Sequence, residues 1–330
     1  MNQTLNGIRR ILITILVAMG VGALFIVAIG ENPIDAYAAL FRGAFDGELR
    51  LGTTLAGFTP LLLTSIAFAV AAKAGAFNVG VEGEVFLGGI TAAYIGINWT
   101  FLPKPALYVA CFVGAMVVAA AWAFIPAVLR AYYNVNEVCT TILMNTVALY
   151  ITSYLVSGPM SAGTANAQSL PVTVRLYQFM KPSSVNVGIF IAAITVIVII
   201  FMLQKSSWGY KIRTVGLNPT HADYVGIDSK KVFVGAMMLS GMLGGMAGCI
   251  EVLGVHGYFL NNFATGLGSN GMLAALIVKN NMVSTPFMAF FLAVLKSGAM
   301  GMQQSTGVPK SLVDTITAVF IIIATMETAF

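Results

Sequence analysis

Charged residues are scarce in this chain of 330 residues: Asp, Glu, Lys and Arg make up 9% of it, whereas hydrophobic residues make up 58%. Soluble domains carry about 25% charged residues. A soluble fold of this composition would expose apolar area over most of its surface, which excludes an ordinary soluble globular protein. The mean hydropathy of +0.89 indicates instead a protein whose solvent is lipid.

Cysteine and histidine are scarce as well, and this limits the possible chemistry. Cys111, Cys139 and Cys249 lie in apolar stretches without the spacing of a disulfide framework or a metal site. His221 and His256 are far apart in the sequence, so we predict no metal site. No G-x-x-x-x-G-K-[ST] motif is present, so this chain should not bind ATP through a P-loop. No nucleophile and base stand together as in an enzyme.

The basic residues outnumber the acidic ones by 17 to 12. They are spread singly or in pairs rather than along one stripe, which argues against a nucleic-acid partner. Lys and Arg instead mark the cytoplasmic side of membrane proteins. The inner segments hold Arg9, Arg10, Lys73, Arg130, Lys205, Lys211, Arg213, Lys230, Lys231 and Lys279; the outer ones hold Arg42, Arg50, Lys104, Arg175, Lys181 and Lys310. This excess predicts that both termini are cytoplasmic.

Long apolar runs recur along the whole chain, and most approach the ~20 residues that a helix needs to cross hydrocarbon. We predict an all-α polytopic membrane protein with about eight to ten transmembrane helices in a single domain, residues 1–330. Gly-rich stretches suggest that some helices are broken or re-entrant. The candidate spans are 11–30, 53–72, 83–99, 105–128, 138–157, 187–203, 232–254, 264–280, 284–302 and 311–328.

Two breaks between spans are longer than simple connectors. The outer one, about 158–186, carries three prolines and is predicted to be an extracytoplasmic loop. The inner one, about 205–231, is the most charged stretch. Within it, Asn218 and Pro219 suit the cap and first position of a helix, and Gly226 suits its end. A short surface helix there could dock a soluble partner, although an ordinary basic loop is an equal alternative.

The stretch KAGAFNVGVEGEVFLGG, residues 73–89, places Asn78, Glu82 and Glu84 among glycines. Carboxylates at membrane depth are costly, and broken helices persist there only when they line a cavity or are buried in protein. This stretch, including Phe77, is therefore a candidate wall of a pathway. The alternative is a turn near the inner surface with both glutamates in water.

A second polar stretch, NVNEVCTTILMN, covers residues 134–145. At 3.6 residues per turn, Glu137 and Thr141 share one helix face, with Asn145 below them. Such a stripe should face protein or water. The alternative is a helix start in which Asn136 caps and Glu137 complements the dipole. Both interpretations can hold together.

The sequence GLGSNG, residues 266–271, matches a dinucleotide-binding pattern only formally, because no strand precedes it and no acidic residue follows at the required distance. It is better interpreted as the start of a half-helix whose N–H groups point to a substrate oxygen, followed by 272–278. The polar candidates near it are Asn261, Asn262, Ser269 and Asn270. Glycines spaced by four in the span 232–254 also predict close packing on a neighbouring helix.

Four segments together, the three above and GYKIRTVGLNPTHADYVGI, resemble the permease subunits of bacterial ABC importers, closest to the group for nucleosides and simple sugars. The resemblance covers roughly residues 50–328. It implies an inner-membrane permease with two inverted repeats that pairs with a second permease. It also implies ATPase subunits that bind Mg-ATP below and a substrate-binding lipoprotein above.

The resemblance also implies residue roles. The family's coupling segment matches 216–226, so the ATPase should contact Gly216, Asn218, Pro219, His221, Asp223, Tyr224 and Gly226. The family's F-N-x-G-x-E-G stretch matches Ala76 to Glu84, and its N-E-V…N stretch matches Asn136, Glu137 and Asn145. Glu84 stands where the nucleoside group has Gln, and Met282 follows Asn281 where Pro is expected.

We therefore expect a non-catalytic permease subunit without a cofactor of its own, carrying a nucleoside. A simple sugar such as a pentose is the alternative cargo within the same machine. The main rival is an ion-coupled secondary transporter in which Glu82, Glu84 or Glu137 carries a proton. A membrane enzyme is less favoured, because no nucleophile or metal cluster is visible. An ordinary channel would conduct without ATP, which electrophysiology could show.

Overall fold

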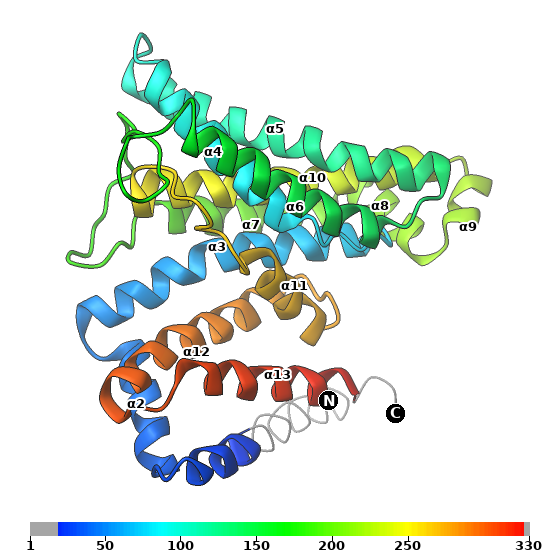
Figure 1. Cartoon of the computed structure of the whole chain (residues 1–330). Helices are drawn as coiled ribbons and strands as arrows, with labels where there is room; N and C mark the ends of the chain where they lie inside the picture. Colours follow the sequence, from blue (N-terminus) through cyan, green and yellow to red (C-terminus); the bar gives the residue numbers. More distant parts are fainter. Residues whose placement is uncertain (1–18, 327–330) are drawn as a thin grey trace.

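The structure is a computed structural model that describes residues 19–326, and within that range it is built of helices joined by loops, with isolated β-bridges only. Figure 1 shows most of the helices lying roughly along one direction. After the helix Met19–Ala28, the elements are α2 (Pro33–Phe45), α3 (Gly47–Lys73), α4 (Val81–Asn98), α5 (Lys104–Tyr133), α6 (Glu137–Ser157), α7 (Gly188–Lys205), α8 (Ser207–Leu217), α9 (Pro219–Tyr224), α10 (Ser229–Ile250), the π-helix η1 (Glu251–His256), α11 (Leu267–Ile277), α12 (Thr285–Thr306) and α13 (Lys310–Met326).

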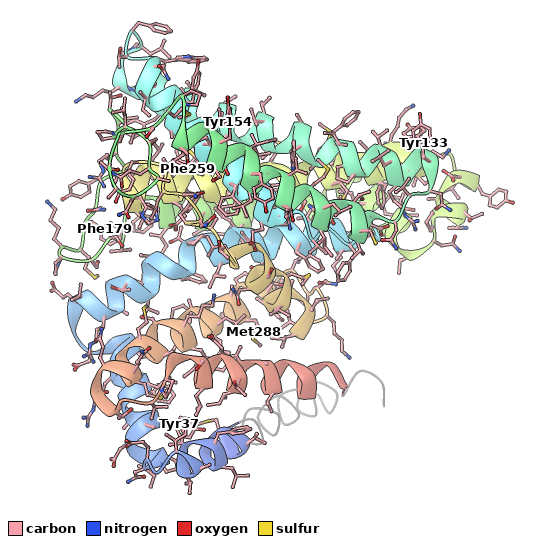
Figure 2. All side chains as sticks on the ribbon, in the orientation of Figure 1. Tyr37, Tyr133, Tyr154, Phe179, Phe259 and Met288 are labelled. Carbon is pink, nitrogen blue, oxygen red and sulfur yellow. The ribbon has the colours of Figure 1, made fainter. Side chains whose placement is uncertain are left out.

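Burial separates an inner set of helices from an outer set. In their most apolar windows α3 is 78% and α10 67% buried within the protein, whereas α6 is only 17% buried. The outer faces of α5, α6 and α7 expose large apolar side chains such as Val113, Leu143 and Ile194. Figure 2 shows side chains projecting outward along these helices. Because apolar side chains are stable against lipid tails, the outer set faces the bilayer and the inner set forms the protein interior.

The prediction of an all-α polytopic membrane protein is confirmed, and the number of long spans is smaller than the eight to ten predicted. Six described helices are long and apolar enough to cross a membrane, or seven if the bent pair Met19–Ala28 and α2 counts as one span. The predicted span 264–280 is corrected: α11 has 11 residues, about 16 Å at the rise of an α-helix, and cannot cross alone. Two further predicted spans, 83–99 and 311–328, correspond to helices that are not among these six. They are α4, which begins with two glutamates, and α13, which has 17 residues.

The N-terminal region contains a helix that the sequence analysis missed. Asn32 caps α2 by accepting a hydrogen bond from the Ile34 amide, and Pro33 takes the first helical position. The axis of α2 is bent by 115° from that of Met19–Ala28. Residues 11–18 of the predicted span 11–30 and residues 327–328 of the span 311–328 lie outside the described residues, as do Arg9 and Arg10.

The glycine spacing in 232–254 does produce close packing, as predicted. A Cβ atom on Gly248 would lie 2.0 Å from the carbonyl oxygen of Val85 in α4, and one on Gly245 would lie 2.4 Å from the carbonyl oxygen of Ala115 in α5. A glycine in α4 also allows this close packing, because a Cβ on Gly88 would lie 2.4 Å from the Gly245 backbone. The backbones of α4, α5 and α10 therefore pack directly against one another, and a side chain larger than glycine does not fit at these positions.

Candidate translocation site and coupling segment

A break between α3 and α4, residues 74–80, holds a buried polar cluster of Asn78, Glu84 and Ser240. The Asn78 amide donates to Glu84 Oε1 and to Ser240 Oγ of α10, both at 2.9 Å, and the Gly80 amide donates to Asn78 Oδ1. Both Asn78 and Glu84 are 1% exposed, and Glu84 Oε2 lacks a hydrogen-bond partner within the described residues. The cluster ties the break to α4 and α10.

This placement corrects one part of the pathway prediction. Asn78 and Glu84 were expected on an accessible wall, but in this structure they lie in packed protein, the other setting in which a broken helix persists at membrane depth. Gly244 makes room for the carboxylate, since a Cβ there would lie 2.9 Å from Glu84 Oε2. Phe77 is half-buried and packs edge-on against Phe68 with centroids 5.0 Å apart.

Asn145 of α6 supports the same break from its other side. Its Oδ1 accepts from the Gly83 amide at 2.8 Å, and its Nδ2 donates to the Val79 carbonyl at 2.9 Å. The first amides of a helix lack partners within the helix, so a side chain from another helix that bonds one of them fixes where α4 begins. Asn145 is thus a tie between α6 and the break.

An Asn145→Ala variant should melt at a lower temperature than wild type, with a loss of about 1–3 kcal/mol in the free energy of unfolding, because a backbone amide and a carbonyl lose their partner inside the protein. Thermal unfolding in detergent measures this loss. Thr146→Ala is the matched control, since Thr146 is exposed on the next position of the same helix. Equal melting of the two variants would contradict this role for Asn145.

The remaining residues of the second polar stretch act at the start of α6. Asn136 caps the helix by accepting from the amides of Val138 and Cys139. The Glu137 carboxylate pairs with Arg130 Nε at 3.1 Å, and the Thr141 hydroxyl donates to the Glu137 carbonyl. The capping interpretation therefore accounts for Asn136, and Glu137 lies in an ion pair between α5 and α6.

The predicted half-helix is present as α11, which starts five residues earlier than expected, at Leu267. Its glycines let it enter the corner between α3 and α4: a Cβ on Gly268 would lie 2.5 Å from the Glu82 amide nitrogen, and one on Gly271 would lie 2.3 Å from Thr64 Oγ1. Ser269 Oγ donates to Glu82 Oε2 at 3.3 Å. The first turn of α11 thus brings two predicted pathway residues together, Glu82 and Ser269.

The other three candidates lie around α11. The Asn270 side chain donates to the Gly266 carbonyl. Asn261 Nδ2 donates to Ser153 Oγ of α6 at 3.3 Å, while Asn261 Oδ1 is buried without a hydrogen-bond partner within the described residues. Asn262 is exposed and adopts a left-handed backbone, φ +61°. Asn270 also lines a cavity that is described below.

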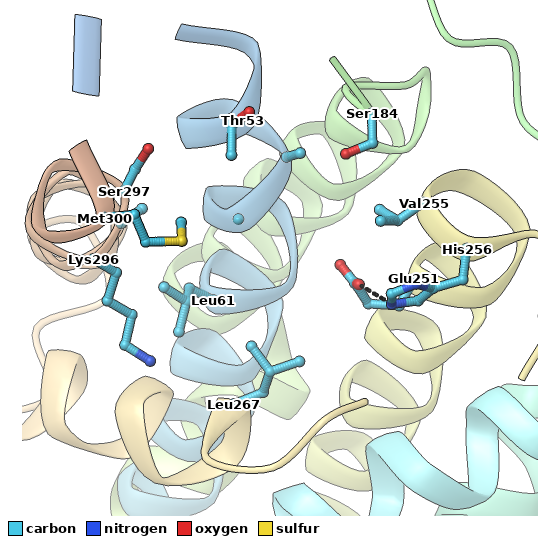
Figure 3. Close-up of a pocket in the computed structure, with 13 residues that line it drawn as sticks. Thr53, Leu61, Ser184, Glu251, Val255, His256, Leu267, Lys296, Ser297 and Met300 are labelled. Carbon is cyan, nitrogen blue, oxygen red and sulfur yellow. Dashed lines mark ion pairs between the residues drawn. The ribbon is translucent and has the colours of Figure 1, made fainter. Parts of the chain in front are cut away.

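A cavity of about 250 Å³, called here the central cavity, lies between α3, η1, α11 and α12. Figure 3 shows the Glu251 carboxylate pointing into it from η1, opposite Lys296, Ser297 and Met300 on α12. Its lining residues are Thr53, Ala56, Gly57, Leu61, Ser184, Glu251, Val255, His256, Leu267, Ala293, Lys296, Ser297 and Met300. Apolar walls with a few convergent polar groups are typical of small-molecule sites.

A second cavity of about 260 Å³, the α13 cavity, adjoins the first at Lys296, which lines both. It is lined by Asn270, Leu273, Leu292, Lys296, Val313, Asp314, Thr317 and Ala318. The first turns of α11 separate the two, since Leu267 faces the central cavity and Asn270 the α13 cavity. Lys296 is thus the residue common to the two linings.

Sequence reasoning missed the polar groups of the central cavity. In the sequence, Glu251, His256 and Lys296 each stand among apolar residues without a neighbouring charged or catalytic partner. They could have been found from the free-energy cost of placing an ionisable side chain in the membrane, because such a side chain within a span marks a functional site by default. The structure adds a second signal, since both Glu251 and His256 belong to a π-helical turn, a form that occurs often at functional sites.

The loop 158–187 holds the C-terminal end of η1 in place. Its donors satisfy backbone carbonyls that the π-helix leaves free: Arg175 Nη2 bonds His256 O, Gln178 Nε2 bonds Gly254 O, and the Leu176 amide bonds Leu253 O, at 2.8–2.9 Å. Ser184 of the same loop lines the central cavity. The loop therefore joins the surface at one end of the molecule to the cavity wall.

The charged break at 205–231 forms two short helices at the opposite end of the molecule from the loop 158–187, as Figure 1 shows. Asn218 caps α9 by accepting from the His221 amide, Pro219 opens it, and Gly226 follows it with φ +81°. The predicted start and end of this helix are both correct. Asp223 points back instead of outward, because its carboxylate accepts from the amide and hydroxyl of Ser229 at the start of α10.

One contact joins this end to the break between α3 and α4. A Cβ on Gly216, at the end of α8, would lie 2.1 Å from the Lys73 carbonyl oxygen. Beyond it, Leu217, Tyr224 and Val225 are exposed by 88%, 85% and 54%, respectively. These three residues, the apolar tip, lie at the two ends of α9, where His221 is exposed and Ala222 is buried. Exposed apolar groups with a polar rim mark protein–protein contacts.

Comparison with known proteins supports a transport role. The chain is 33% identical over 320 residues to the guanosine ABC transporter permease NupP of Bacillus subtilis, covering 94% of this chain and 91% of that one. It is 32% identical to the glucose ABC transporter permease TsgB13 of Haloferax volcanii, covering 94% and 85%. It is 30% identical to the nucleoside ABC transporter permease NupB of Lactococcus lactis, covering 97% and 91%. Residues 50–325 match the family described as the permease component of branched-chain amino acid transport systems, and the chain, a multi-pass membrane protein, belongs to this family of ABC transporter permeases.

Proposed function

We propose that this chain is the permease subunit of an ABC importer of the bacterial inner membrane and forms the path of a nucleoside. The observation that carries the proposal is the contact of Gly216 with Lys73, because it connects an exposed docking helix to the break in the inner helices. In this orientation both termini and α9 are cytoplasmic, and the loop 158–187 is extracytoplasmic.

The partners follow from the two exposed ends. An ATPase subunit, which binds Mg-ATP and carries out the hydrolysis, docks on α9 and the apolar tip, and an extracytoplasmic substrate-binding protein docks above the loop 158–187. A second permease completes the path. This chain then needs no cofactor of its own, since its task is to open and close rather than to make or break bonds.

Closure of the ATPase would push α9 and α8, and the Gly216 contact would pass that movement to the end of α3. The break 74–80 can absorb it, while the cluster of Asn78, Glu84 and Ser240 carries it to α10. Helix α10 continues directly into η1, whose Glu251 and His256 line the central cavity. A partner that binds one arrangement of these helices more tightly thereby shifts the cavity between its outward and inward states.

A nucleoside is the favoured cargo because two of the three relatives above carry nucleoside or guanosine in their names. The glucose permease supports a simple sugar as the alternative. In either case the cargo passes the central and α13 cavities, with Glu82, Ser269 and Asn270 at the first turn of α11. A proton-coupled carrier is less supported, because Glu84 is sealed in protein and Glu137 is paired with Arg130.

Uptake by proteoliposomes tests the proposal. The permease pair, its ATPase and its binding protein should accumulate radiolabelled nucleoside only with ATP inside. The chain reconstituted alone, with a proton or sodium gradient, should accumulate none. Gradient-driven uptake by the chain alone would establish a secondary transporter instead, and ATP-driven uptake of pentose but not nucleoside would change the cargo and leave the machine intact.

A further inference from the structure

The Glu251 carboxylate lacks strong partners although it lies deep in the protein. The residue is 8% exposed, and the His256 Nε2 atom is 3.7 Å from its Oε2 atom. That distance permits an ion pair when the imidazole is protonated, but it is longer than the 2.7–3.2 Å of an N–H···O hydrogen bond. The carboxylate therefore keeps unused acceptor positions, and Figure 3 shows that they face the central cavity.

An ionisable group in this setting needs donors, and the cavity's own donors lie apart from it. Lys296 and Ser297 come from the opposite wall, on α12. The Thr53 hydroxyl donates to the Leu49 carbonyl of its own helix. A buried carboxylate without hydrogen bonds is costly, so a cargo that offers donors at this point is stabilised there.

The lining and the volume of the cavity limit which hydrogen-bond donors of a cargo could bind Glu251. The two oxygens of a carboxylate accept best from a pair of adjacent donors. The cavity wall also offers apolar side chains, Val255 on η1 and Leu61 and Met300 across from it, which can pack on the C–H face of a sugar ring. The volume, about 250 Å³, is close to the lower end of ligand pockets, about 300 Å³, which suits one small cargo.

We propose that Glu251, positioned by η1 beside His256, is a subsite that recognises the vicinal hydroxyls of the cargo's sugar ring. This subsite rests on the nucleoside import proposed above. It places the ribose of the cargo on the η1 side of the central cavity. His256, held between the rings of Tyr258 and Phe263, competes with the diol for the carboxylate. This competition keeps binding weak enough for release into the α13 cavity.

The test compares uridine with 2′,3′-dideoxyuridine in proteoliposomes that hold the complete importer. Glu251→Gln should lower uridine uptake about tenfold and dideoxyuridine uptake less than twofold, because only the first loses charge-assisted hydrogen bonds. The binding protein's own preference enters the wild-type and variant ratios equally and cancels between them. Glu48→Gln removes the same charge at an exposed position of α3 and should leave both rates at wild-type level.

Equal losses for both nucleosides, or an unchanged ratio, would overturn the subsite while leaving nucleoside import intact. If the wild-type importer carries neither nucleoside, the proposed cargo is wrong. Uptake of ribose and of 2-deoxyribose by the same variants would then be compared instead. If the wild-type importer carries neither of these sugars as well, the subsite is also refuted. If Glu251→Gln fails to assemble, Ser297→Cys in the native complex keeps the test open. Uridine should slow alkylation of that cysteine, and dideoxyuridine at equal concentration should not; equal protection overturns the proposal.

Discussion

Gly248→Ala should destabilise the permease by about 3 kcal/mol and should sharply reduce its folded yield. The added Cβ would lie 2.0 Å from the Val85 carbonyl oxygen and 2.7 Å from the Gly89 nitrogen. Both neighbours are backbone atoms of α4, so no side chain can rotate away, and α10 must separate from α4. Thermal unfolding in detergent and the monodisperse fraction after purification measure the effect.

Gly57→Ala is the matched control for that change. Gly57 also lies inside a long helix, α3, but a Cβ there would meet nothing within 4 Å. The alanine should keep or slightly raise the melting temperature, because alanine is the better helix former. If Gly248→Ala melted together with Gly57→Ala, the backbone contact between α4 and α10 would not exist in the folded protein.

Tyr224→Ala should abolish ATP-driven uptake by releasing the ATPase. The Tyr224 side chain is 85% exposed on α9, so in the proposed complex its loss removes a contact with the ATPase and little contact within the fold. Aromatic residues at the centre of an interface often contribute more than 2 kcal/mol, which corresponds to about a thirtyfold weaker complex. Co-purification of the ATPase from detergent, with the melting temperature of the permease unchanged, is the measurement.

Gly216→Ala provides the contrasting result, because Gly216 faces inward, against Lys73. The tip would still bind the ATPase, but α8 would be forced away from the end of α3. ATP hydrolysis should therefore continue while uptake falls. If Tyr224→Ala retained the ATPase, or if Gly216→Ala transported normally, the path of movement from α9 to the break would be wrong.

Local rules were enough to predict the short helix α9. Asn218, Pro219 and Gly226 mark the ends of α9 through capping and backbone conformation, which depend on a few neighbouring residues. Composition alone likewise identified the membrane class. Helix α2 was missed although Asn32 and Pro33 carry the same kind of signal, because 31–52 had been interpreted as an outer connector.

The role of a polar residue inside the membrane, in contrast, depends on partners that are far away in sequence. Asn78 is sealed because Ser240, 162 positions later, lies beside it. Asn145 was predicted as part of a polar stripe, and its partners are backbone atoms of residues 79 and 83. Glu251 and Lys296 face one cavity only because η1 and α12 lie on opposite sides of it. None of these pairings can be derived from spacing along the chain.

In the proposed transport cycle, an ATPase on α9 opens the central cavity alternately to the two sides of the membrane. Site-directed labelling of Ser297→Cys tests it, in a permease whose Cys111, Cys139 and Cys249 are replaced. In the assembled importer, a membrane-impermeant thiol reagent should reach this position from the extracytoplasmic side in one nucleotide state and from the cytoplasmic side in the other. Labelling that is independent of nucleotide, or absent from both sides in every state, would contradict the account.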